Sequence, residues 1–342
     1  MYPILEINLA KLKHNTEAIT KMIKDFGGIT FAVTKVVGGE PEIGQALLAG
    51  GARGLADSRI SNIIKLRQAG ITAPILLLRS AALSEIKQVI SLTDISLNSE
   101  KQVLLALNNE AVVQQKRHGV ILMTDLGDGR EGVSPDRLVD LAEYAKELSQ
   151  LFIYGIGTNL ACFSGETPTL EHMRKLVDLS RLIGNDVQYI SGGNSSGLYL
   201  LTSNQWDKPW LKEINHWRIG ESIFLGCDIT TKEPLRNCYQ DVCMLKAEVI
   251  EVQEKAVANY PKTVRIVVAL GRQEIGAGRL YPSNSRFRII GTSSDHLVLV
   301  SESPDSHTNK VGSIITFALD YQSLLATATS PYVTITFNND CL

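Results

Sequence analysis

Several short stretches of the sequence carry side chains whose type and spacing could do chemistry. Lys35 directly follows the apolar segment Phe31-Ala32-Val33-Thr34, which is expected to be a buried strand. An ammonium group at the end of a buried strand is costly unless it is paired or deprotonated. A desolvated lysine is therefore a candidate Schiff-base former or proton-transfer base. The alternative is that Lys35 caps the strand and extends its ammonium group into solvent.

A second stretch, Gly127-Asp128-Gly129-Arg130-Glu131-Gly132, follows an expected strand and precedes an expected helix. Arg130 stands between flexible glycines, so its guanidinium could be directed at the carboxylate of an amino or keto acid. The alternative is a solvated loop arginine that pairs with a neighbouring acid.

Two further stretches favour an anion site. In Gly192-Gly193-Asn194-Ser195-Ser196-Gly197 the glycines allow close backbone approach, and Ser195 can donate to a phosphate. Alone, this is equally an ordinary glycine turn with a serine cap. Arg218-Ile219-Gly220-Glu221 follows, where Gly220 could complete the anion site, although an isolated Arg218 would be a surface arginine. Together, the strand-end lysine, the two arginines and the glycine-serine turn suit a pyridoxal phosphate enzyme that acts on an amino acid.

The elements that must position these residues alternate between strands and helices. Helical patterns at 41–49, 59–69 and 135–148 separate short β-rich segments. This alternation predicts an α/β fold, a (β/α)8 TIM-type barrel over residues 10–225, with a doubly wound sheet as the alternative. In such a barrel the functional residues lie at the carboxyl ends of the strands. The eight predicted strands are 30–36, 54–57, 74–78, 94–97, 120–125, 154–159, 187–192 and 217–224.

The residue composition and the hydrophobic pattern change after residue 225. Short segments rich in β-branched residues are separated by Gly, Pro, Asn and Ser, which predicts a C-terminal β-rich domain over residues 226–342. Only 321–326 looks helical. The opening strand within residues 1–9 is expected to join this domain. The predicted strands are 246–257, 263–270, 287–291, 296–302, 313–319 and 332–337.

Composition narrows the class of protein. The 342 residues include 34 Lys and Arg against 36 Asp and Glu, so no basic excess indicates a nucleic-acid partner. The apolar segments are too short to span a bilayer, and Glu6 interrupts any signal-like run at the N-terminus. The cysteines form no C-x-x-C pair. We therefore expect a cytoplasmic protein with free thiols and a small-molecule substrate, and with no metal site, nucleic-acid partner or membrane attachment.

The sequence resembles the alanine racemase family of pyridoxal phosphate enzymes nearly end to end, and within it the ornithine racemase type. The segment 31–36 is similar to the one that carries the family's cofactor lysine. Asp125 to Gly132 resembles its Asp-Thr-Gly-Met-x-Arg-x-Gly motif. Asn194-Ser195-Ser196 is similar to its phosphate-binding segment, and Arg218 with Gly220 to its Arg-x-Gly. The segments 56–60 and 293–296 resemble the ornithine racemase type.

The resemblance implies a role for each matching residue. Lys35 would hold pyridoxal 5'-phosphate and move the α-proton on one face of the substrate. Arg218 would face the pyridine nitrogen and Arg130 the substrate carboxylate. Around the cofactor, Asn159 would lie near the ring where relatives have a histidine. The phosphate would be held by Asn194, Ser195, Gly220, Glu221 and Tyr332. The resemblance also implies a homodimer in which the partner's β-domain completes the active site.

Three departures from the family pattern bear on the mechanism. Gly39 stands where the family has a phosphate-binding tyrosine, and Met123 where some relatives have a carbamylated lysine. The segment Leu270-Gly271-Arg272-Gln273-Glu274 lacks the tyrosine that serves as the family's second base.

Racemisation needs protonation from both faces, so another group must act. Our hypothesis is His296, with Asp295 next; the alternative is that His296 is an ordinary strand-end histidine. Asp295 or Glu221 would bind a basic side chain of the substrate.

These observations predict a racemase of ornithine or another basic amino acid. A decarboxylase with the same fold and cofactor is the alternative enzyme. A non-catalytic pyridoxal-phosphate-binding protein is the alternative from a different class.

Overall fold

A computed structural model describes the chain except for residues 185, 203–207, 255–263, 302–309 and 340–342. Two compact units are distinguished. The barrel unit comprises residues 13–35 and 39–238. The C-terminal unit comprises residues 1–12, 36–38 and 239–342.

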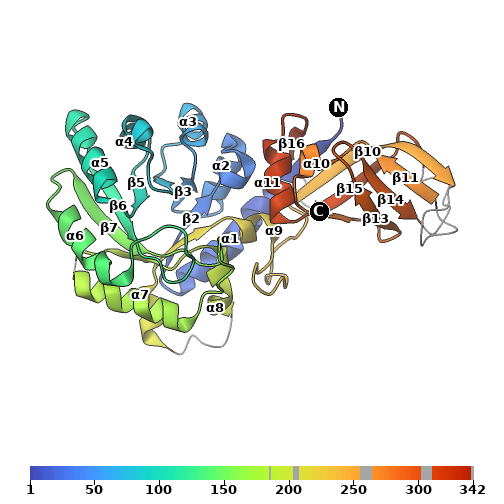
Figure 1. Cartoon of the computed structure of the whole chain (residues 1–342). Coiled ribbons are helices and arrows are strands. Elements are labelled where there is room, and N and C mark those ends of the chain that lie inside the picture. Colours follow the sequence, from blue (N-terminus) through green and yellow to red (C-terminus); the bar gives the residue numbers. More distant parts are fainter. Residues whose placement is uncertain (185, 203–207, 255–263, 302–309, 340–342) are drawn as a thin grey trace. The chain divides into compact units, whose positions relative to one another are not determined.

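The barrel unit contains a closed barrel of parallel strands in sequential order, which confirms the predicted (β/α)8 fold (Figure 1). Neighbouring strands pair in parallel all the way round, and β2 closes the barrel on β9, with Phe31 opposite Arg218. The carboxyl ends of all these strands therefore meet at one rim. The strands are β2 (Ile29–Val33), β3 (Gly54–Asp57), β4 (Ile75–Leu77), β5 (Ile95–Asn98), β6 (His118–Met123), β7 (Leu151–Gly157), β8 (Tyr189–Ser191) and β9 (His216–Ile219).

Helices follow the strands and lie outside the barrel (Figure 1). Their boundaries follow local chemistry: Pro41 occupies the first turn of α2, and Thr169 caps α7 by accepting from the backbone N–H of His172. The helices turn apolar faces inward, and each fully buried Leu or Ile contributes about 1.5–3 kcal/mol. They are α1 (Leu9–Asp25), α2 (Pro41–Ala49), α3 (Ile60–Gln68), α4 (Ile86–Leu92), α5 (Lys101–Val113), α6 (Leu138–Lys146), α7 (Leu170–Ile183), α8 (Leu198–Thr202) and α9 (Glu221–Leu225).

One predicted strand was wrong in its second half. The segment 217–224 was expected to be extended throughout, but β9 ends at Ile219 and α9 begins at Glu221. Gly220 separates them, and Ile223 and Phe224 are buried on the helix. A short apolar segment with β-branched residues has the same sequence pattern in a strand and in a buried helical turn.

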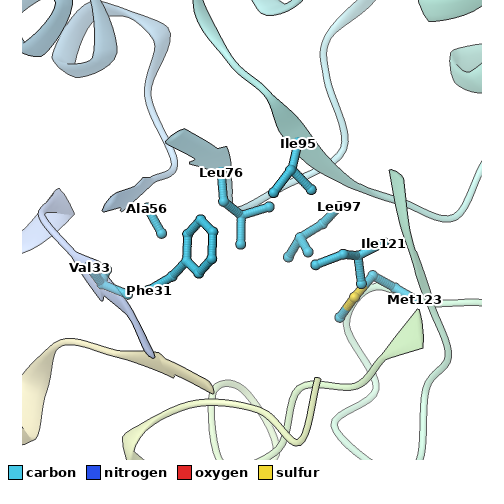
Figure 2. Packing of buried hydrophobic residues seen from close by; sticks show 8 residues of the cluster. All are labelled: Phe31, Val33, Ala56, Leu76, Ile95, Leu97, Ile121 and Met123. Carbon is cyan, nitrogen blue, oxygen red and sulfur yellow. The ribbon is translucent and has the colours of Figure 1, made fainter. Parts of the chain in front are cut away.

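The barrel interior is filled by side chains. Figure 2 shows a buried cluster contributed by strands β2 to β6, and its residues are Phe31, Val33, Ala56, Leu76, Ile95, Leu97, Ile121 and Met123. Met123 stands where some relatives have a carbamylated lysine. Its side chain is 1% exposed, so in this chain the position is an uncharged part of the packed interior. Because the interior is packed, the polar strand ends at the rim are the part of the barrel that is open to ligands.

The C-terminal unit is built on a mixed β-sheet, as predicted. The strand order is β12-β15-β10-β11-β14-β13, and β1 (Ile4–Asn8) adds to it by pairing antiparallel with β10 and parallel with β16. Through this pairing the opening strand forms part of the sheet of the C-terminal unit. The other elements are β10 (Cys243–Glu254), β11 (Val264–Val268), β12 (Leu280–Pro282), β13 (Phe287–Thr292), β14 (Leu297–Ser301), β15 (Ile314–Leu319), β16 (Thr334–Asn338), α10 (Arg272–Ile275) and α11 (Tyr321–Thr329).

The sequence analysis missed two short elements of this unit, α10 and β12. Their three or four residues are too few to show a period. The predicted strand ends at 255–257, 263 and 302 lie outside the described residues. Among the helices of the described part of the chain, none combines the length and apolar character that a bilayer crossing requires.

Candidate functional site

The guanidinium of Arg218 is buried at the rim end of β9 and is held by three acceptors. Its Nε donates to Ser191 Oγ at 3.0 Å, its Nη1 to Asn159 Oδ1 at 2.8 Å and its Nη2 to the carbonyl oxygen of Thr158 at 2.6 Å. All three acceptors are uncharged. Burial lowers the pKa of Arg218 to about 10, so the group stays protonated at neutral pH. The site thus keeps a fixed positive charge inside the barrel rim.

A buried histidine, His216, is connected to Arg218 through the hydroxyl of Ser191. Ser191 Oγ accepts from Arg218, so it donates its own proton to Nδ1 of His216, 2.9 Å away. His216 is therefore neutral, with its proton assigned to Nε2. Burial, together with the charge of Arg218, lowers the pKa of His216 to about 3. The ring lies 4.9 Å from that of Phe31, centroid to centroid.

Next to Arg218, the ends of β8 and β9 form a cradle of hydrogen-bond donors. Ser195 Oγ accepts from the backbone N–H groups of Gly220 and Ser222, both at 3.3 Å. The buried hydroxyl of Ser222 has no hydrogen-bond partner among the residues that the structure describes. Gly220 has no room for a side chain, because a Cβ there would lie 2.9 Å from the Cβ of Val33. Asn194 shapes the turn by accepting from the backbone N–H of Ser196 at 2.9 Å.

The loop after β6 is closed on itself. The carboxylate of Asp125 accepts from the backbone N–H groups of Gly127 at 2.9 Å and Gly129 at 3.1 Å. Gly132 has a φ of +126°, and a Cβ there would lie 2.5 Å from the backbone nitrogen of Asp125. The glycines are therefore required by the fold of the loop, which fixes the direction of the residues between them.

Within this loop Arg130 is paired with two acids. Its Nε lies 2.9 Å from Glu131 Oε2 and 3.6 Å from Asp128 Oδ2, and its Nη2 donates to Glu131 Oε1 at 3.0 Å. Glu131 also accepts from Asn159 Nδ2 at 2.6 Å. Pairing with a neighbouring acid, one of the two interpretations of Arg130, is thus observed. The same contacts connect Arg130 to Asn159 and so to Arg218.

Lys35 begins a 3-10 helix (Lys35–Val37) just beyond β2, the strand beside β9. Its side chain has no hydrogen-bond or ion-pair partner among the described residues, so its amino group is available. The preceding Thr34 is anchored, since its Oγ1 donates to Asp57 Oδ2 at 2.7 Å. Asp57 Oδ1 accepts from Arg59 N at 2.9 Å and Asn62 Nδ2 at 3.0 Å. Burial raises the pKa of Asp57, while these hydrogen bonds oppose the shift.

The position of the family's phosphate-binding tyrosine is closed to any side chain. Gly39 has a φ of +69°, and a Cβ there would lie 2.6 Å from the Cβ of Asn62. Asn62 is itself held by Asp57. The glycine in this chain is therefore matched to its surroundings, and no phosphate contact comes from residue 39.

Three segments of the C-terminal unit meet at the position where the family's second base is missing. The backbone N–H groups of Arg272 and Gln273 donate to the carbonyl oxygens of Ser293 and Ser294, both at 2.9 Å. Ser330 Oγ donates to the carbonyl oxygen of Gln273 at 3.3 Å. The segment that lost the tyrosine thus lies against both the segment of Asp295 and His296 and the segment that leads to Tyr332.

Asp295 and His296 form an exposed pair. His296 Nδ1 lies 3.0 Å from Asp295 Oδ1, and their side chains are 47% and 60% exposed. The hydrogen bond from His296, with a second one from Ser294, holds the pKa of Asp295 below its ordinary value. Tyr332 is also exposed, at 62%. These three predicted residues belong to the C-terminal unit, whereas the others belong to the barrel unit.

The structure brings together Asn159, Arg218 and Arg130, and separately Ser195 with Gly220. Glu221 follows Gly220 as the first residue of α9. Several supporting residues were not predicted, because their residue types are frequent in ordinary loops and strands. They are Glu131, Asp128, Ser191, His216, Ser222, Asn62 and Thr34. The only signal was position, since most of them stand at or just beyond strand ends.

The fold and these clusters define a class of protein: a (β/α)8 barrel enzyme with a donor-rich anion cradle, a buried arginine and an available lysine, followed by a β-domain. The family described as alanine racemase, N-terminal domain, matches residues 7–227. The ornithine racemase of Acetoanaerobium sticklandii is 36% identical, over 97% of this chain and 99% of that protein. The lysine racemase of Thermotoga maritima is 32% identical, over 97% and 98%. The chain belongs to the alanine racemase family of pyridoxal-phosphate-dependent amino-acid racemases.

Solved structures share the fold. The alanine racemase from E. faecalis superposes with a TM-score of 0.74 at 19% identity, covering 98% of both chains. A D-threonine aldolase from Filomicrobium marinum has a TM-score of 0.78 at 18% identity, covering 96% of this chain and 88% of its own. At these identities the likeness concerns the fold.

The barrel residues fit pyridoxal phosphate. The Ser222 hydroxyl has no partner among the described residues, and Ser195 Oγ accepts from two backbone N–H groups and keeps its own proton to donate. These two hydroxyls are donors that a phosphate requires. Arg218 has more N–H groups than its three hydrogen bonds use, so one can face a ring nitrogen. Lys35, just beyond the adjacent strand β2, offers an amino group that has no partner in the part of the chain that the structure describes.

Proposed function

We propose that the protein interconverts the L- and D-enantiomers of ornithine or another basic amino acid. The observation that carries this substrate class is the similarity, over nearly the whole chain, to one racemase named for ornithine and one named for lysine. Matches to enzymes named alanine racemase cover less of the chain, 59% in the Carboxydothermus hydrogenoformans enzyme. Full-length similarity includes the C-terminal unit, where the family's second base is absent.

The cofactor would be held by the barrel residues. Ser195, Ser222 and the backbone of Gly220 and Glu221 would bind the phosphate, with Asn194 shaping the turn and Tyr332 approaching it. Asn159 would lie beside the ring. Arg218 would face the pyridine nitrogen, and its permanent charge would keep a proton off that nitrogen. When bound, pyridoxal phosphate withdraws electrons from the substrate's α-carbon, which makes the α-proton removable.

Two groups would move the proton, one on each face of the substrate. Lys35 would bind the cofactor through Nζ and, when displaced by the substrate, would remove or return the α-proton with the same atom. On the other face we assign His296, oriented by Asp295 at 3.0 Å, in the place of the family tyrosine. The direct backbone contacts between 271–273 and 293–295 support this assignment.

The substrate would be held at its two ends. Arg130 would bind the α-carboxylate, and Asp295 or Glu221 would pair with the distal ammonium group. We further propose a homodimer in which Asp295, His296 and Tyr332 come from the partner subunit. All three side chains are largely exposed within one chain, as residues that complete a partner's site would be. A cytoplasmic location is proposed because the four cysteines within the described residues are free thiols, as is usual in a reducing compartment.

The first test follows the α-proton. The purified protein, loaded with pyridoxal phosphate, is incubated in D2O with L-ornithine, L-lysine, L-arginine or L-alanine. We expect α-deuteration together with appearance of the D-enantiomer, fastest for ornithine or lysine. Loss of carbon dioxide without inversion would favour the decarboxylase instead. Absence of exchange with every amino acid would favour a non-catalytic cofactor-binding protein.

The second test concerns the shared site. Lys35→Ala and His296→Ala proteins are expected to be inactive alone. If Lys35 of one subunit works with His296 of the other, a mixed dimer holds one intact site and regains activity after unfolding and refolding together. If each site is built from a single subunit, every site in the mixture carries a mutation, and no activity returns.

A further inference from the structure

Glu131, which the sequence analysis passed over, contacts two residues of the proposed site at once. Its Oε1 accepts from Arg130 Nη2 at 3.0 Å and from Asn159 Nδ2 at 2.6 Å, and its Oε2 lies 2.9 Å from Arg130 Nε. Both carboxylate oxygens are therefore used. We propose that Glu131 is a positioning residue that fixes both site arginines, Arg130 directly and Arg218 through Asn159. The catalytic consequence rests on the proposed roles of these arginines.

Arg130 is held along one edge. Its Nε and Nη2 face the two oxygens of Glu131 in the parallel geometry that gives guanidinium–carboxylate pairs their directionality. The loop backbone is fixed by Asp125 and Gly132, so the pair is anchored at its base. Nη1, on the other edge, takes part in none of these contacts. Glu131 thus orients the guanidinium and leaves one edge for a substrate carboxylate.

The second arm acts through an amide. Asn159 donates from Nδ2 to Glu131, so its Oδ1 must face Arg218, to which it lies at 2.8 Å. A rotated amide would place an N–H2 group against the guanidinium and lose both bonds. Asn159 is 6% exposed, so water does not readily replace either partner. Glu131 therefore sets the direction of the amide that holds Nη1 of Arg218.

The charges of the contacting residues also support a positioning role for Glu131. Burial lowers the pKa of Arg218, and the negative charge of Glu131 opposes that shift. The contacts join two loops and a strand, since Glu131 is 28 residues from Asn159, and Asn159 is 59 from Arg218 on β9. A carboxylate that holds one arginine directly and the other through an amide fixes the directions of both guanidinium groups.

The test compares Glu131→Gln with Asn159→Ala in protein labelled with 15N-arginine. Glutamine keeps the volume but removes the negative charge and turns one acceptor into a donor. One of the three contacts therefore breaks, and the two that remain lose their charge-assisted strength. We expect the Nε–H resonances of both Arg130 and Arg218 to shift and to exchange faster with water in Glu131→Gln. In Asn159→Ala only that of Arg218 should change. Glu213→Gln, which breaks the exposed pair with Arg181 at 2.6 Å, is the matched control and should alter neither.

Activity gives the second readout. In Glu131→Gln we expect kcat/KM for the preferred amino acid to fall by roughly 10- to 100-fold, with a rise in KM because Arg130 is released. An Arg218 resonance unaffected by Glu131→Gln, or kcat/KM within about twofold of the wild type, would overturn the proposal. Asn159→Ala keeps the connection testable should Glu131→Gln fail to fold. The resonances are measured without substrate, so failure of the racemase function leaves this result independent.

Discussion

Acid should destabilise this protein through two buried histidines. His118, the first residue of β6, bonds to Ser96 Oγ at 2.8 Å, and burial lowers its pKa to about 4. Burial, together with the charge of Arg218, lowers that of His216 to about 3. In the unfolded chain both have a pKa near 6.5. Below pH 6.5 each histidine is protonated in the unfolded state but stays neutral in the folded state, so the free energy of unfolding falls as the pH falls. This loss continues down to about pH 4 for His118 and about pH 3 for His216.

The magnitude follows from linkage. Each unit of pH below 6.5 removes about 1.4 kcal/mol per histidine, so at pH 5 each histidine has lost about 2 kcal/mol and the two together about 4 kcal/mol. Such a loss would lower the melting temperature by several degrees and would clearly lower the urea concentration at the midpoint of unfolding.

The assay is urea unfolding of the cofactor-loaded protein at pH 7, 6 and 5, at one protein concentration. Between pH 7 and pH 5 the free energy of unfolding of His118→Asn should fall by about 2 kcal/mol less than that of the wild type, because one of the two buried histidines with a lowered pKa is absent. His14→Asn, at an exposed position, is the control and should follow the wild type. If His118→Asn and the wild type lose equal stability on acidification, the buried-histidine explanation is wrong.

Three further predictions concern the site. Arg218→Lys should lower kcat/KM by roughly 100-fold or more, since an ammonium cannot reach the three acceptors that surround the guanidinium; steady-state kinetics measure this, with circular dichroism as a check of folding. Gly132→Ala should destabilise the fold by roughly 2 kcal/mol or more, because of its φ of +126° and the close contact with Asp125; an unchanged urea midpoint would contradict the loop geometry. Asp57→Asn should cost about 1–3 kcal/mol and slow the reaction of Lys35, since one of the two oxygens that accept from Thr34 and Asn62 is replaced by a donor; borohydride trapping of the cofactor measures that rate.

The sequence predicted most of the elements and indicated candidate site positions. Strand β3 and helix α2 have the predicted boundaries, because hydrophobic period and turn residues are local properties of the chain. Lys35, Arg130, Ser195 and Arg218 were proposed as site residues from their places at or near the ends of expected strands. The parallel barrel brings all strand ends to one rim, so position along the chain was enough to group them.

Other features depended on the tertiary structure. The segment 221–225 is helical rather than extended, and Arg130 pairs with Glu131, whose carboxylate reaches Asn159 and through it Arg218. The sequence determined which residues stand at the strand ends, because periodicity is set within each element. Only the folded barrel decided which of them touch, because contacts between loops tens of residues apart depend on strand register and on the direction of each loop.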